Sequence, residues 1–179
     1  MYFKSAFLFS MMVSAMALPT TTMMEKTKRQ ANILQVQDYV QFQISDGVGG
    51  NALAEVQAKF PIDESNLASV SSQDLAIIKA ARKTAENAET RGGGFNEAIA
   101  NAGGTNTPQG RILQVGKIKN KVLKLKLFAL SLQIDQARGR DVADKLADTL
   151  TKLNKNVELD RASAGQPSRG VNFQGSSQP

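Results

Sequence analysis

Three glycines in the run DGVGGN, residues 46–51, have the composition of a loop that could bind a phosphate. Such loops use backbone N–H groups and join a strand to a helix, with G-x-G-x-x-G spacing or a Gly-Lys-Ser/Thr ending. Neither spacing is present here, and helical patterns lie on both sides of the run. We therefore predict a turn between two helices, with Gly47 ending the first helix and Gly50 or Asn51 capping the second.

The chain contains no histidine and no cysteine, so imidazole bases, thiolate nucleophiles and soft metal sites are ruled out. Serine–lysine or paired-carboxylate chemistry is the remaining enzymatic alternative. The best carboxylate cluster is Asp141, Asp144 and Asp148, which share one face of a predicted helix. A hard cation usually draws ligands from a loop that wraps around it, whereas acids in a first helical turn are favoured by the helix dipole. We expect a solvated face with Asp141 as helix cap, no bound metal or cofactor, and no enzymatic activity.

Six cations and no acid occur between residues 111 and 126. On a helical wheel Lys117, Lys121 and Lys124 share one edge. Such a local field can attract lipid head groups, nucleic acid or an acidic polysaccharide. The alternative is that these lysines flank a core helix and extend outward into solvent. We name Lys117, Lys121 and Lys124 as the candidate contact with an anionic surface.

The first thirty residues have the features of a secretion signal followed by a processing site. A cation at Lys4, an apolar run over residues 7–18 and a small-x-small ending at Ala17 predict a signal peptide over residues 1–17. The apolar run is too short to span a membrane. Lys28 and Arg29 form a dibasic processing site, so we predict a pro-segment over residues 18–29. A buried amino-terminal helix and an uncut basic tail are the alternatives.

Processing after Arg29 changes the charge of the chain. The full sequence has 22 basic and 16 acidic residues, and residues 1–29 hold four of the basic residues and one acid. The remaining 18 basic and 15 acidic residues give a net charge of +3, which weakens the case for nucleic acid as a partner. Without cysteine, no disulfide can stabilise this secreted chain, so the fold must depend on a hydrophobic core.

Apolar periodicity predicts an all-α, single-domain helical bundle over residues 30–162. Four of the predicted helices have clear bounds, at residues 33–44, 51–60, 95–102 and 112–137. A further helix begins after Ser71 and is broken at Gly92, and the last one follows Asp141. Helix 112–137 has two apolar stripes, which indicates a central position with packing on both sides. The Gly-, Ser-, Gln- and Pro-rich tail over residues 163–179 is predicted to be disordered.

The block from Asp38 to Gly47, DYVQFQISDG, and the run NALAEV from Asn51 to Val56 resemble a group of small secreted proteins of filamentous fungi. In that group a similar block opens a helical domain. The resemblance implies a fungal source and an extracellular destination, and it brings no activity and no catalytic residues.

These observations together predict a secreted, non-enzymatic protein, extracellular or cell-wall-associated, that acts by binding an unidentified extracellular partner other than nucleic acid. The alternative is a membrane-active or lipid-binding module that places the lysine-rich amphipathic helix 111–137 on a membrane surface.

Overall fold

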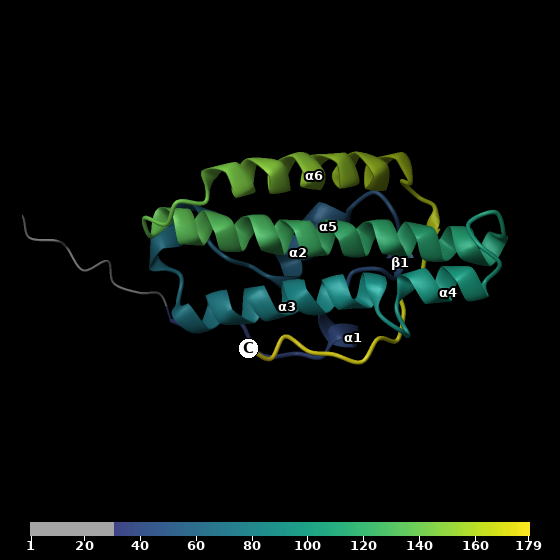
Figure 1. Ribbon diagram of the computed structural model, residues 1–179, viewed down its shortest axis with the longest axis horizontal. Helices are drawn as coiled ribbons and strands as arrows, with labels where there is room; N and C mark the ends of the chain where they lie inside the picture. The colour runs from purple at the N-terminus through teal and green to yellow at the C-terminus, as the bar shows by residue number, and fades with distance from the viewer. Residues whose placement is uncertain (1–30) are drawn as a thin grey trace, which may run out of the picture.

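Helix α5, Pro108–Ala137, lies at the centre of the molecule in the computed structural model, which describes residues 31–179. Helix α3, Ser72–Thr90, and helix α6, Ala143–Ala162, lie along its two sides (Figure 1). At the start of α5 the Thr107 hydroxyl accepts a hydrogen bond from the Gly110 N–H, and Pro108 occupies the first turn, where its missing N–H costs nothing.

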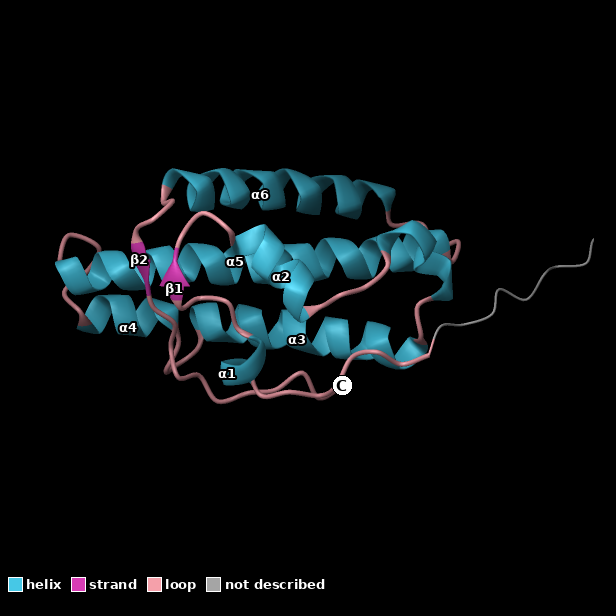
Figure 2. Ribbon diagram, turned by 180° about the vertical axis from the view of Figure 1, so that it is seen from behind, coloured by secondary structure: helices cyan, strands magenta, loops and turns pink. Residues whose placement is uncertain are grey.

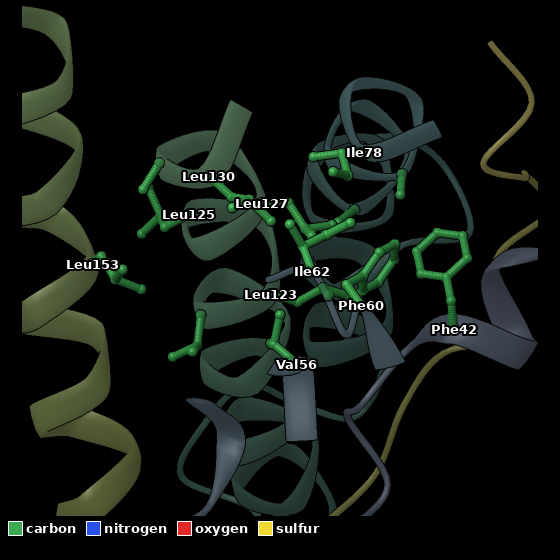
Figure 3. Close-up of a cluster of buried hydrophobic side chains, with 14 of the residues drawn as sticks. Phe42, Val56, Phe60, Ile62, Ile78, Leu123, Leu125, Leu127, Leu130 and Leu153 are labelled. Carbon is green, nitrogen blue, oxygen red and sulfur yellow. The ribbon is translucent and has the colours of Figure 1, made fainter. Parts of the chain in front are cut away.

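The two apolar stripes of α5 pack on different neighbours, which confirms the predicted two-sided helix. Leu123 points toward Val56, whereas Leu125 lies on the side of Leu153 from α6 (Figure 3). All four side chains are buried. The all-α fold predicted from the sequence is thus confirmed, with α5 enclosed by its neighbours.

Shorter elements cover one face of the layer formed by the three long helices. Helices α1, Tyr39–Phe42, and α2, Ala52–Lys59, lie on the face seen in Figure 2. The 3-10 helix η1, Glu64–Ser69, also contacts α5. Helix α4, Phe95–Asn101, lies beside the amino-terminal half of α5 (Figure 1). The predicted helices 51–60 and 95–102 therefore exist with nearly the predicted bounds.

The predicted helix over residues 33–44 is wrong, because only Tyr39–Phe42 is helical. The backbone N–H groups of Ile33 and Leu34 donate to the Asp74 carboxylate, at 3.2 and 2.9 Å from Oδ1. These bonds replace the intrahelical bonds that residues 31–38 would otherwise need. At the start of α3 the Ser71 hydroxyl accepts from the Asp74 N–H at 2.9 Å, as the sequence predicted.

The predicted disorder of residues 163–179 is also wrong. Strand β2, Pro167–Ser168, pairs antiparallel with strand β1, Gly47–Val48. Residues 163–179 contain few apolar side chains. Disorder was predicted because burying so few side chains could not offset the entropy lost on ordering the segment. The segment is instead held by main-chain hydrogen bonds, which depend little on side-chain type.

The rest of this tail ties the amino-terminal segment to the bundle. The Tyr39 N–H donates to the Gly175 carbonyl at 2.7 Å, and the Ser177 N–H donates to the Gln37 carbonyl at 2.8 Å. The Phe173 ring packs edge-on against Tyr39, with centroids 5.9 Å apart. The folded unit consequently runs over residues 31–179, beyond the end of α6.

The predicted signal peptide, pro-segment and processing residues Ala17, Lys28 and Arg29 lie outside the described residues. Among the helices of residues 31–179, none has both the length and the apolar character that a bilayer crossing needs.

Tyr39 is fully buried, and its hydroxyl donates to the Asn120 side-chain oxygen at 2.8 Å. Burial raises the pKa of Tyr39 well above its ordinary value of about 10. Because the unfolded chain ionises first, the stability that this group contributes is intact below pH 10 and is lost as the pH rises above it. We expect the free energy of unfolding to fall above pH 10, and to fall less steeply in Tyr39→Phe.

Residues 30–179 contain one tyrosine, so ultraviolet titration of tyrosinate reports Tyr39 alone. Urea unfolding of both variants from pH 8 to pH 11 gives the stability comparison. Appearance of tyrosinate near pH 10 in the folded protein would contradict the prediction.

Candidate functional site

The N–H groups of the glycine loop are bound to acceptors within the protein. The Asp160 carboxylate accepts from Gly50 and Ala52, both at 2.9 Å, and the Gln166 carbonyl accepts from the Gly49 N–H at 3.0 Å. A phosphate would need these same donors. The loop is therefore a structural connection, as the sequence predicted, and Asp160 from α6 caps the start of α2.

Two details of the predicted turn are corrected. Gly47 lies in β1 and does not end a helix, because α1 already ends at Phe42. Asn51 occupies the N-cap position of α2, but its side chain makes no capping bond, since the Asp160 carboxylate takes that place. Gly50 has φ of +110°, and a β-carbon there would lie 2.9 Å from Ala164, so a larger residue would be strained.

A fully buried lysine, Lys119 of α5, holds this loop from beneath. Its ammonium donates to the carbonyls of Asp46 and Val48, each at 2.9 Å, and lies 3.0 Å from the Glu55 carboxylate. A lysine has three N–H donors, and these partners use all of them. We call this arrangement the lysine hub. Its ammonium is paired with the Glu55 carboxylate.

The lysine hub was missed because Lys119 was grouped with the outward-pointing lysines. The sequence does indicate that Lys119 faces the core, since Lys119 precedes Leu123 by four residues and Leu127 by eight. That spacing places it on the apolar stripe that faces the core.

The three predicted surface lysines lie along one edge of α5, facing α3 and α4, and each has a partner within the protein. Lys124 lies 2.6 Å and Lys121 3.8 Å from the Glu89 carboxylate. Lys117 donates to the Asn96 side-chain oxygen at 2.7 Å. The edge therefore connects α5 to its neighbours, and its positive charge is partly neutralised.

The predicted acidic face on α6 is exposed, and Asp148 pairs with Lys152 at 2.7 Å. Asp141 does not cap the helix, because α6 begins at Ala143 with Val142 in the N-cap position and no side-chain cap. Across residues 31–179, no three acidic side chains come together as a metal-binding group.

A hollow of about 360 Å³ lies between residues 43–46 and α2. Both of its acids have partners already, since Glu55 binds Lys119 and Asp46 accepts from the Gly170 N–H at 2.8 Å. This hollow therefore offers little to orient a polar ligand.

An open groove runs between α3 and α6, with α5 as its floor. It consists of two lobes of about 400 and 190 Å³, which share Arg82 and Phe128. We call it the basic groove, because five cations and three acids line it, a net charge of +2. The cations are Lys79, Arg82, Lys124, Lys145 and Lys152, and the acids are Glu86, Asp135 and Asp148.

Phe128 positions two cations of the basic groove. The Arg82 guanidinium carbon lies 4.5 Å and the Lys145 ammonium 5.3 Å from the centre of its ring. Cations at this distance are attracted by the ring quadrupole. Arg82 also pairs with Glu86 at 3.0 Å, whereas no carboxylate within residues 31–179 pairs with Lys145. Lys145 is the groove cation whose charge is least compensated.

The fold and site define a single-domain helical protein with a closed lysine hub and an open basic groove. The chain belongs to the family described as Domain of unknown function (DUF8454), whose sequence profile matches residues 34–172. No curated protein and no solved structure matches the chain. The matched range includes the lysine hub and the basic groove.

Proposed function

We propose that this is a secreted protein, extracellular or cell-wall-associated, that acts by binding a partner in the basic groove and not by catalysis. The observation that carries the proposal is the groove itself, an open hollow with an excess of cations in which Lys145 has no carboxylate partner among residues 31–179. Export is supported by the amino-terminal sequence, with its signal-like run and the Lys28–Arg29 pair.

The polar interior gives little support to catalysis. Lys119 is the best-placed buried amine, but its three hydrogens are committed to acceptors in the lysine hub. Ser45 is also buried, so a substrate could not reach its hydroxyl without opening the fold. A serine–lysine pair needs a hydroxyl that both the amine and the substrate can reach, which this arrangement does not offer.

The alternative of a membrane-active module would require α5 to expose Leu123 and Leu127. Both side chains are fully buried in the bundle. The most exposed large apolar side chains, among them Val40 and Val48, lie outside the basic groove. We therefore expect the protein to stay in the supernatant when anionic vesicles are sedimented at low salt.

The proposal is tested with labelled protein of residues 30–179 on washed intact cells of the producing organism. We expect retention at low ionic strength, reduced at least about tenfold in the double variant Lys145→Glu, Lys152→Glu, because rim charges govern such association. The control Lys83→Glu, Lys155→Glu makes the same charge change on exposed positions of α3 and α6 outside the groove. Equal loss in both variants, or no retention of the wild type, would refute a binding role for the groove.

A further inference from the structure

The cations of the basic groove repeat along its length. On the α6 wall Lys145 lines the larger lobe, and Lys152 lines the smaller lobe two helical turns later. Seven residues of α-helix rise about 10 Å, so the α-carbons of these two residues lie on the same side of α6 about 10 Å apart. Arg82 on the opposite wall contributes to both lobes. A linear ligand in the groove would meet positive charge at intervals of about 10 Å.

Apart from Lys145, the lysines of the groove already bind carboxylates within the protein. Lys79 lies 2.9 Å from the Asp135 carboxylate, and Lys152 lies 2.7 Å from Asp148. Each lysine has three donors, and each of these contacts uses one. The side chains of Lys79 and Lys152 are 43% and 61% exposed, so their other N–H groups can donate to a second carboxylate.

Other anionic partners fit the groove less well. Sugar rings and nucleic acid bases stack on open aromatic faces, but the one aromatic ring in the groove, Phe128, carries Arg82 and Lys145 over it. A bilayer surface needs apolar side chains that insert beside the cations, and Leu125 and Leu132 on the groove floor are buried. The groove suits a narrow chain that presents carboxylates and little apolar surface.

From this spacing we infer that the basic groove binds an extended acidic segment of a partner protein, with a carboxylate at every third residue. Polyproline II backbone has three residues per turn and rises about 3.1 Å per residue, which places such carboxylates on one side and about 9 Å apart. The first carboxylate pairs with Lys145 and Arg82, and the second pairs with Lys152 and Lys124. This inference rests on the proposed binding role of the same groove.

The test measures binding of a fluorescent nine-residue peptide, three repeats of Glu-Pro-Pro, to protein of residues 30–179 at low salt. We expect Kd to rise at least about tenfold for Lys145→Glu and to change less than about threefold for Lys155→Glu, which lies on α6 outside the groove. A Gln-Pro-Pro peptide removes the charge, and a peptide with three adjacent glutamates followed by six prolines keeps the charge but removes the spacing. Both should bind at least about tenfold more weakly than the Glu-Pro-Pro peptide.

The outcomes separate this inference from the proposed function. Equal binding of the spaced and clustered peptides, or equal effects of the Lys145 and Lys155 variants, overturns the inferred spacing. Polygalacturonate or phosphatidylserine vesicles could instead bind in a Lys145-dependent manner while the peptides do not. The groove would then bind another class of ligand, and the peptide inference would fail. If none of these probes depends on Lys145 and cell retention is also unchanged, the proposed function fails with it.

Discussion

Replacement of Lys119 with methionine is expected to lower the free energy of unfolding by about 1–3 kcal/mol. Methionine fits the length of the buried side chain but removes the positive charge and all three donors. The carboxylate of Glu55 and the carbonyls of Asp46 and Val48 then lose their partner beneath β1. The two carbonyls face the fully buried Lys119 position, where a methionine offers them no donor in return. Urea denaturation measures the loss as a lower midpoint with little change in slope.

The matched control is Lys126→Met on the same helix. Lys126 lies 2.6 Å from Glu64, a carboxylate that water can solvate once the lysine is removed. Lys119 differs because it also donates to two backbone carbonyls. We expect a loss of at most about 1 kcal/mol. In the double variant Lys119→Met, Glu55→Leu, little of the loss should be recovered, because the Glu55 carboxylate is 35% exposed and the two carbonyls still lack a donor. Similar small losses for Lys119→Met and Lys126→Met would show that the lysine hub does not support the loop.

The long helices could be predicted because their signals are local and repeated. In α5 the apolar side chains recur over many turns, so single polar residues do not obscure the two stripes. The start of α3 is set by Ser71 and Asp74, which are three residues apart. These contacts lie within one element, and a sequence pattern reports them directly.

Contacts between distant segments left no such pattern. The extended path of residues 31–38 depends on Asp74, which lies about forty residues further along the chain. The tail depends on bonds donated by the backbone N–H groups of Tyr39 and Ser177, which any residue type except proline could supply. Neither contact changes the periodicity of the segment that it orders, so a helix and a disordered tail were predicted instead.

The basic groove illustrates the same limit at the candidate site. Lys145 was not singled out, since on its own it is one exposed lysine on a polar helix face. Lys145 becomes part of a site because α3 and α6 flank α5. This arrangement brings Arg82 of α3 and Lys145 of α6 to the ring of Phe128. Of the lysines that were singled out, Lys117 and Lys121 face α4 and α3 and have partners there. Lys124 pairs with Glu89 of α3 and also lines the basic groove.

Replacement of Gly116 with alanine should destabilise the protein, although alanine is the better helix former. In α5 the change would gain about 1 kcal/mol from helix propensity alone. A β-carbon at Gly116 would, however, lie 2.0 Å from the Arg169 carbonyl oxygen of the tail, too close for any atom pair. The tail must move, and overpacking of this kind costs about 1–3 kcal/mol or more. We expect a net loss of at least about 1 kcal/mol, measured by urea denaturation.

The tail itself reports whether this contact is the cause. The Arg169 N–H donates to the Ile112 carbonyl at 3.3 Å, and the Ser177 N–H donates to Gln37, so both amides should be protected from hydrogen exchange. In Gly116→Ala we expect faster exchange at Arg169 and unchanged protection within α3 and α6. Gln136→Ala, at an exposed position of α5, should change stability by no more than about 0.5 kcal/mol and leave the tail protected. A stabilised Gly116→Ala variant would mean that the tail does not rest on α5, and that its order is as weak as its composition alone predicts.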